Sequence, residues 1–254
     1  MIVNYAIGDV HGCIDLLNEM HSQIRQDVKD RYSPETDDIT VIHLGDYCDR
    51  GPHSRKCIDA VMDYDDFPSI SLKGNHEVAL LQAMYNPVGF GRIWAGTEIW
   101  GGMETINDFV DDPFTSREAC ADWIVTANLF GIVGKRRIEW LRSLPEHHTS
   151  LLAHFVHAGV DPSLGGFSEQ TTTSRLWTRN EEFLNMGITN TTLPVVHGHT
   201  IQKVAGIHGN RIGVDIGSFK TDKLASVVMD NSGRTDFISV KPIGIGIYTR
   251  ERAS

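Results

Sequence analysis

The chain has 254 residues, enough to bury a substantial core as one large α/β domain or as two small ones. With 41% hydrophobic and 22% charged residues, the composition is typical of a soluble globular enzyme and excludes a disordered or fibrous chain. The 33 acidic residues outnumber the 23 basic ones, which gives a formal net charge of -10. This charge argues against general affinity for nucleic acid or anionic membranes, so an anionic substrate needs a locally positive site.

The first third of the chain alternates short apolar runs with amphipathic segments. We expect strands at 2–7, 39–44 and 70–72, and helices at 14–28 and 57–62. This order is typical of a parallel sheet, in which ligands gather in the loops beyond the carboxyl ends of the strands. These loops are therefore where chemistry is expected.

From about residue 80 to residue 145 the pattern becomes mainly helical. It includes a stretch rich in glycine and tryptophan at 89–102. This stretch lacks the GxxxxGK[ST] pattern of a nucleotide-phosphate loop and is not preceded by a strand. We therefore expect 80–145 to be a helical insertion that serves as a lid or contacts the substrate.

The rest of the chain returns to short apolar runs separated by turn residues. Further strands are expected at 151–156, 195–196, 211–214, 224–229 and 236–240. Their close spacing favours an antiparallel or mixed sheet. No linker or repeat divides the chain, so we expect one domain over 1–254. The last segment, 241–254, fits a tail and a final strand equally well.

Targeting signals and cysteine motifs do not stand out. The chain enters its first strand without a basic leader segment, and no apolar run reaches the length of a membrane span. The four cysteines form no CxxC pair and are too sparse for a disulfide scaffold. We therefore expect a cytoplasmic protein with reduced thiols and no membrane partner.

Five strand ends carry glycines next to side chains that bind metals. The first three strands are followed by GDVHG at 8–12, GDYCDRG at 45–51 and GNHE at 74–77. Two later strands end in HAG at 157–159 and HGHT at 197–200. Glycine lets the backbone turn sharply past a strand, so that the side chains that follow point into one crevice. The coincidence of five such loops favours a metal site.

The early loops provide ligands for two cations. Asp9 and His11 stand two residues apart and can aim at one cation, and a carboxylate with an imidazole suits Mn, Fe or Zn. Asp46 can bridge two metals roughly 3.5 to 4 Å apart. Each residue alone has a structural alternative, because a strand-end aspartate is more often a helix cap or a turn former.

The second cation needs further ligands, and three side chains can supply them. Asn75 offers an amide oxygen, and His157 and His199 offer ring nitrogens. An isolated histidine near an apolar strand is more often a hydrogen-bonded core or surface residue. We assign that structural role to His43, His147, His148 and His154.

The motifs resemble those of the phosphoprotein phosphatase family of metallophosphoesterases. The family signature is GDxHG, GDxxDRG, GNHE, a His-Ala-Gly-like motif and a Gly-His-Thr motif, in that order. The likeness runs from residue 8 to about residue 218 and is closest to the bacterial and phage branch, which also contains the symmetrical diadenosine tetraphosphatases. Trp100-Gly-Gly with Thr105, and LWTR at 176–179, resemble that branch's WxxGGxxT and LWxR elements. The resemblance implies a four-layer α/β/β/α sandwich of two mixed sheets with flanking helices.

The resemblance also implies roles for individual residues. It places Asp9, His11 and Asp46 on the first metal, and Asp46, Asn75, His157 and His199 on the second. It implies that Arg50, Arg179 and Asn75 bind the substrate phosphate, and a planar guanidinium can grip two phosphoryl oxygens at once. His76 is implied as the general acid, oriented by Asp49.

Two positions in these loops need comment. The branch often has arginine just before GNHE, whereas this chain has Lys73, which keeps the charge but loses the two-pronged contact with phosphate. Cys48 lies inside the second loop, where a thiolate nucleophile is an alternative to metal chemistry. That alternative is disfavoured because no Cys-x5-Arg phosphate loop accompanies it.

We therefore expect a hydrolase that uses two divalent metal ions, Mn in first place with Fe, Zn or Ni as alternatives. The predicted reaction is direct attack on a phosphate monoester by a water that bridges the two metals and is activated by them. The predicted substrate is phosphoserine or phosphothreonine in proteins, with phosphotyrosine as a further possibility. A symmetrical diadenosine tetraphosphatase or another nucleotide phosphohydrolase is the alternative. A non-catalytic regulatory protein is a minor alternative, because such a protein is expected to have lost a motif residue.

Overall fold

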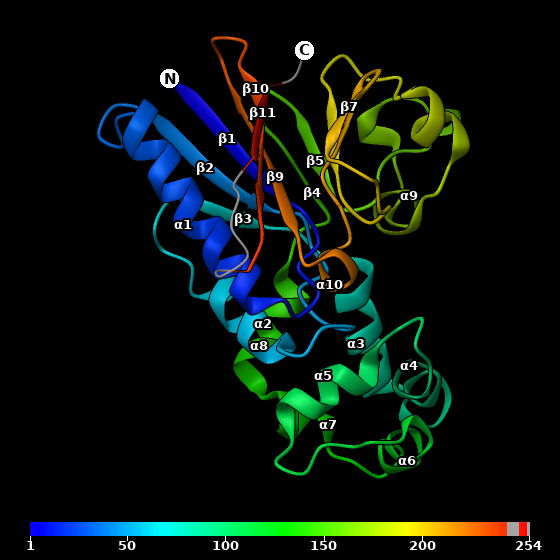
Figure 1. The fold of residues 1–254 in the computed structure, drawn as a ribbon. Helices are drawn as coiled ribbons and strands as arrows, with labels where there is room; N and C mark the ends of the chain where they lie inside the picture. Colours follow the sequence, from blue (N-terminus) through cyan, green and yellow to red (C-terminus); the bar gives the residue numbers. More distant parts are fainter. Residues whose placement is uncertain (243–248, 253–254) are drawn as a thin grey trace.

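The computed structural model describes residues 1–242 and 249–252 of the chain (Figure 1). The strands of the first sheet are β1 (Ile2–Ile7), β2 (Asp38–His43), β3 (Ser69–Ser71), β9 (Leu224–Asp230), β10 (Thr235–Val240) and β11 (Thr249–Arg252). The strands of the second sheet are β4 (His147–Thr149), β5 (His154–Val156), β6 (Val195–His197), β7 (Gly206–His208) and β8 (Arg211–Gly213).

Both sheets are mixed. The first has the order β11-β10-β9-β1-β2-β3, in which β1, β2 and β3 are parallel and β9 to β11 are antiparallel to their neighbours. The second has the order β4-β5-β6-β8-β7, with a parallel centre and an antiparallel strand at each edge. The late strands therefore split between the two sheets, because β9 and β10 return to pair beside β1.

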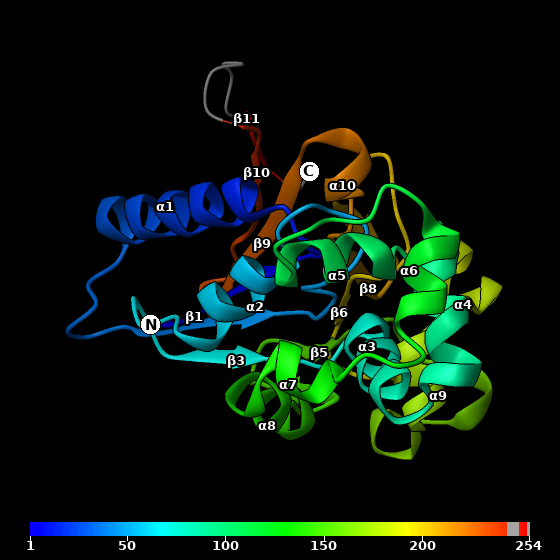
Figure 2. The ribbon, with the colours of Figure 1, turned by 90° about the horizontal axis from the view of Figure 1, so that it is seen from below.

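Helices cover the outer faces of the sheets and gather at one end of the molecule. The α-helices are α1 (Ile14–Arg31), α2 (Ser54–Met62), α3 (Asn75–Tyr85), α4 (Arg92–Gly96), α5 (Gly102–Phe109), α6 (Arg117–Trp123), α7 (Leu129–Val133), α8 (Lys135–Ser143), α9 (Thr172–Trp177) and α10 (Ser218–Thr221). Short 3-10 or π turns occur at η1 (Pro87–Gly91), η2 (Pro162–Leu164), η3 (Phe167–Glu169) and η4 (Glu182–Met186). Figure 1 shows α1 along the first sheet and α4 to α7 below the strand ends, and Figure 2 shows the same helices from below.

Side-chain alternation along β1 explains the layers. Val3, Tyr5 and Ile7 point into the core between the first sheet and its helices, whereas Ala6 points into the core between the two sheets. This is the period of two that a strand imposes. The inter-sheet core contains Ile42, Leu44, Phe155, Val196, Ile212 and Val227, among others. The expected four-layer α/β/β/α architecture is confirmed.

The expected elements of the first third match the structure closely. The strand expected at 151–156 is shorter, because Ser150 makes a turn whose hydroxyl accepts the N–H of Leu152 at 2.9 Å, and β5 begins only at His154. The strands β4 and β7 were not expected, since each is a three-residue edge strand with little apolar character.

Of the segment 241–254, Thr249–Arg252 form β11 beside β10, and 243–248 and 253–254 lie outside the described residues. None of the helices in the described part of the chain has the length and apolar character that crossing a bilayer requires.

Candidate metal centre

The five glycine-containing loops meet at the carboxyl ends of the strands, and their backbone is unusual there. A positive φ is uncommon for a residue with a side chain and persists only where the surrounding structure enforces it. The loops nevertheless place five such residues in this region: His11 (φ 45°), Asp46 (φ 55°), Asp49 (φ 69°), Arg50 (φ 70°) and His199 (φ 61°). All five are among the predicted site residues, so the strain is concentrated where chemistry is expected.

Close packing of the loops accounts for two of the glycines. Gly45 has a φ of 100°, and a Cβ at this position would lie 2.5 Å from the backbone nitrogen of Gly74. A Cβ on Gly198 would lie 2.1 Å from Oδ1 of Asp9. Because neither site admits a side chain, the loops can approach one another closely enough for their polar groups to meet.

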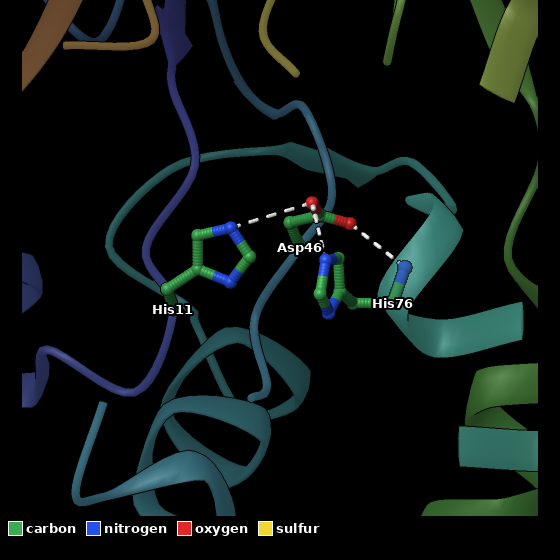
Figure 3. Close-up of side chains that lie close together, drawn as sticks. All are labelled: His11, Asp46 and His76. Atoms are coloured by element: carbon green, nitrogen blue, oxygen red, sulfur yellow. Dashed lines mark hydrogen bonds and ion pairs between the residues drawn. The ribbon is translucent and has the colours of Figure 1, made fainter. Parts of the chain in front are cut away.

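Asp46 lies at the centre of the site. Its Oδ2 is 3.5 Å from Nε2 of His11 and 3.9 Å from Nε2 of His76 (Figure 3). Its Oδ1 is 3.4 Å from Nε2 of His157. Two groups of potential ligands therefore share this carboxylate, one with His11 and His76 and the other with His157 and His199. A shared carboxylate is the arrangement expected of a residue that bridges two cations.

Hydrogen bonds fix the tautomers of His11 and His157. Nδ1 of His11 lies 2.9 Å from the carbonyl oxygen of Cys48, and Nδ1 of His157 lies 2.9 Å from that of Leu44. A carbonyl only accepts, so Nδ1 carries the hydrogen and the lone pair of Nε2 faces Asp46. Burial lowers the pKa of both rings and keeps them neutral, which is the state that binds a metal.

The second group brings acceptors together in a way that suits a cation. Nε2 of His157 lies 2.8 Å from Oδ1 of Asn75, and Nδ1 of His199 lies 2.9 Å from the same oxygen. The lone pair on Nε2 of His157 therefore faces the oxygens of both Asn75 and Asp46. Buried acceptors that face one another are unfavourable unless a proton or a cation lies among them. Imidazole, carboxylate and amide oxygen together fit a divalent transition metal.

Asp9 lies beside this group rather than within it. Its carboxylate oxygens accept the backbone N–H of His199 at 3.1 and 3.0 Å. Burial and the neighbouring carboxylates of Asp215 and Asp46 raise its pKa well above the ordinary value. A divalent cation relieves this repulsion among buried carboxylates. The role of Asp9 as a metal ligand stays a prediction.

Sequence reasoning missed Asp215. It lies two residues past the end of β8 and is buried, and its Oδ1 accepts the N–H of Gly217 at 2.8 Å. Burial, together with the charge of Asp46, raises the pKa of Asp215 to about 6 despite that hydrogen bond. An aspartate just past a strand, with glycine two residues later, repeats the pattern of the other loops, and this signal could have identified it.

The ring of His76 is held by a buried carboxylate. Its Nδ1 lies 2.8 Å from Oδ2 of Asp49, and both side chains are buried. Burial alone would lower the pKa of His76, but the carboxylates of Asp46 and Asp49 outweigh it and raise the pKa above the ordinary value. A protonated imidazole at this place fits the predicted general acid.

The helical insertion supports this acid directly. Nε1 of Trp94, on α4, donates to Oδ2 of Asp49 at 2.8 Å, and Oγ1 of Thr105, on α5, donates to Oδ1 at 2.6 Å. Both side chains are fully buried. Sequence reasoning noted Thr105 only as a motif residue and missed Trp94. This part of the insertion is thus built into the site.

Glu77 ties two of the loops together. Its carboxylate accepts the backbone N–H groups of Asp46, Tyr47 and Gly74, each at 2.8 Å. Burial and the charge of Asp46 raise its pKa to about 7, against these hydrogen bonds. This role of Glu77 was not predicted, although its position in the GNHE motif could have indicated it.

The structure bears on two residues that the sequence singled out, Cys48 and Lys73. Sγ of Cys48 is fully buried, 3.6 Å from Oε1 of Glu77, and burial raises its pKa well above the ordinary value. A buried thiol of raised pKa is a poor nucleophile, so its burial argues against the thiolate alternative. Nζ of Lys73 donates to the carbonyl oxygen of Arg142 at 3.3 Å, so its ammonium group already has a hydrogen-bond partner in the protein.

Arg50 and Arg179 border the space in front of the ligands. A small cavity of about 230 Å³ contains Asn75, His76 and His199 in its walls, and a larger one of about 830 Å³ adjoins it. Both arginines line both cavities. Nη1 of Arg50 donates to Nε2 of His11 at 2.7 Å, so its guanidinium reaches the ligand groups.

Comparison with known proteins gives a consistent family match. The sequence model of the calcineurin-like phosphoesterase family matches residues 5–240. A symmetrical bis(5'-nucleosyl)-tetraphosphatase from Thioalkalivibrio sulfidiphilus is 27% identical over 176 residues, which cover 68% of this chain and 57% of that protein. Its namesake from Acidovorax ebreus is 30% identical over 165 residues, which cover 62% of this chain and 44% of that protein. The chain thus spans about half the length of these relatives.

Solved structures show the same fold. A candidate diadenosine tetraphosphatase superposes with a TM-score of 0.61 at 17% identity, over 95% of this chain and 94% of that one. A cold-active protein-tyrosine phosphatase of a Shewanella species superposes with a TM-score of 0.57 at 17% identity, over 99% of this chain and 80% of that one. These likenesses support the architecture and leave the substrate to the chemistry of the site.

Proposed function

The chain belongs to the calcineurin-like phosphoesterase family, and on this basis we propose that it hydrolyses nucleoside polyphosphates of the dinucleoside tetraphosphate kind. One observation carries the choice of substrate. The ligand groups open into a cavity of about 830 Å³ in a chain whose net charge is -10. Its wall contains more cations than carboxylates: Arg50, Arg117, Arg179 and Lys220 against Glu98 and Glu104. A positive site of this size in an acidic protein suits an extended, highly charged substrate. The curated relatives named for a dinucleoside tetraphosphate support the same choice.

The site residues divide the chemistry among them. Asp46, His11, His157, His199 and Asn75 would hold two divalent cations, with Asp9 beside them. When bound, these cations supply an activated water and offset the charge of the phosphoryl group.

Other side chains bind the phosphate and move the proton. Arg50 and Arg179 orient the attacked phosphate and stabilise the charge on its oxygens in the transition state. His76 gives its proton to the leaving oxygen, and Asp49 keeps the ring charged and aimed. In this scheme the chain itself forms no covalent bond to phosphate.

Hydrolysis of phosphoserine or phosphothreonine in proteins is the second candidate. Ile99 and Ile201 lie at the wall of the larger cavity, where they are 73% and 43% exposed. An extended peptide on either side of a phosphorylated residue can pack on such apolar side chains. The groups that bind and cleave the phosphate are the same for both substrates, so only turnover separates them.

The test compares substrates side by side. Diadenosine tetraphosphate, a phosphoserine/phosphothreonine peptide and a phosphotyrosine peptide are incubated with the protein, with Mn²⁺ supplied or chelated. Metal-dependent release of ADP, with slow turnover of the peptides, is the expected result. Fast turnover of the peptides with no ADP would reject the nucleotide assignment in favour of the second candidate.

A further inference from the structure

Two residues on α10 line the larger cavity beyond the groups that hold metals and the attacked phosphate. They are Phe219 and Lys220, and neither belongs to the five motifs. Nζ of Lys220 lies 5.3 Å from the centroid of the Phe219 ring, and Cζ of Arg50 lies 4.9 Å from the same centroid. One aromatic ring thus borders both cations on the wall of the cavity.

The position of this pair is fixed by the metal loops. Gly217, with a φ of 74°, turns the chain into α10. Oγ of the buried Ser218 lies 2.8 Å from the carbonyl oxygen of Asp9 and 3.0 Å from that of Val10. The Phe219 ring also packs edge-on against His11, with the centroids 5.2 Å apart. Lys220 therefore extends from a backbone anchored on the ligand loop.

Of the four cations that line this cavity, Arg50, Arg179 and Lys220 have no carboxylate within 4.0 Å among residues 1–242. Arg117 is neutralised by Glu104, 2.5 Å away. Glu98 is a further carboxylate in the cavity wall, and it pairs with no cation of the described chain. An unpaired lysine whose backbone is anchored on the ligand loop, and which shares the Phe219 ring with Arg50, favours an anionic ligand.

We propose that Lys220 binds a second phosphate, the one next to the phosphate that is attacked. The ligand class is a phosphate chain, either the bridge of a nucleotide or an inorganic polyphosphate. A monoester with a single phosphate, held by Arg50 and Arg179, does not reach this outer subsite. The inference deepens the proposed function and rests on it for the identity of the attacked phosphate.

The experiment measures inhibition of a single-phosphate reaction by a phosphate chain. Hydrolysis of p-nitrophenyl phosphate by the Mn²⁺-loaded protein is followed at increasing inorganic tripolyphosphate, with free Mn²⁺ held constant. Lys220→Ala is compared with Lys223→Ala, which removes the same charge from an exposed residue three positions away that does not line the cavity. Lys220→Arg serves as the conservative variant.

Lys220→Ala is expected to raise the inhibition constant of tripolyphosphate by about tenfold, the factor that corresponds to 1.4 kcal/mol. Its kcat/KM for p-nitrophenyl phosphate should change by much less than this factor, and Lys220→Arg should restore most of the affinity for tripolyphosphate. An unchanged inhibition constant, or an equal loss for the monoester, would overturn the inference.

Diadenosine tetraphosphate in the same series separates the two sources of the chain and the two proposals. A KM for this nucleotide that rises in Lys220→Ala would identify a nucleotide bridge as the ligand. Lys220-dependent inhibition by tripolyphosphate, without any hydrolysis of the nucleotide, would uphold the outer subsite for inorganic chains and reject the proposed function.

Discussion

Nδ1 of His76 and Oδ2 of Asp49 lie 2.8 Å apart in a fully buried pair, and the same carboxylate oxygen accepts Nε1–H of Trp94. The second oxygen accepts the hydroxyl of Thr105. These donors fix the orientation of the Asp49 carboxylate, which in turn holds the ring of His76. Helices α4 and α5 thus support the pair to which we assign proton transfer under the proposed function.

Replacing His76 should slow turnover without loss of metal. His76→Gln removes the proton donor, and general acid catalysis is typically worth about 10² to 10⁴ in rate. We expect a fall in kcat of that size with metal content unchanged, measured by steady-state kinetics and elemental analysis. Full activity in this variant would show that another group protonates the leaving oxygen.

Removing the charge of Asp49 should move the pH profile of kcat. The carboxylate raises the pKa of His76, so Asp49→Asn lowers that pKa and the ring loses its proton at a lower pH. The alkaline limb of the profile should therefore shift to lower pH. If the alkaline limb of Asp49→Asn lay at the same pH as that of the wild-type protein, His76 would not be the group that titrates in this limb.

Removing Asp46 should abolish both metal binding and activity, because its carboxylate serves both ligand groups. In Asp46→Asn we expect less than one equivalent of Mn²⁺ by calorimetric titration and no detectable turnover. Asp66→Asn is the control, since Asp66 forms an exposed ion pair with Arg25 far from the loops. Two tightly bound equivalents in Asp46→Asn would contradict the bridging role.

Gly45 should tolerate no side chain. Its φ is 100°, and a Cβ at this position would lie 2.5 Å from the backbone nitrogen of Gly74. We therefore expect Gly45→Ala to lower the free energy of unfolding by about 1 to 3 kcal/mol or more. The matched control is Gly166→Ala, because a Cβ there meets nothing within 4 Å and φ is -74°. Urea denaturation checks both, and equal stability of the two variants would refute the packing argument.

Cys48→Ser should retain activity, since the buried thiol contacts Glu77 and takes no part in the proposed chemistry. Turnover within about threefold of the wild-type value is expected. A loss as large as that of His76→Gln would reopen the thiolate alternative, provided that the melting temperature is unchanged.

The sequence indicated those candidate residues that lie at a strand end and close to a glycine. Asp46 and His157 are of this kind, because the strand end alone determines where their side chains go. Trp94 and Thr105 could not be assigned in the same way. They reach Asp49 from separate helices across 45 and 56 residues of sequence, and only tertiary packing brings them there. The edge strands β4 and β7 were missed for a related reason, since their pairing partners hold them rather than their own hydrophobicity.

The most direct test of the proposed two-metal hydrolysis is a metal titration of the metal-depleted protein with diadenosine tetraphosphate as the substrate. Mn²⁺ is added in steps and the release of ADP is followed. We predict no turnover without metal and an activity that reaches its plateau at two equivalents of Mn²⁺. Asp46→Asn should show no activity at any amount of Mn²⁺. Turnover that persists in a chelator, or no turnover with two equivalents of Mn²⁺ bound, would contradict the proposed two-metal hydrolysis.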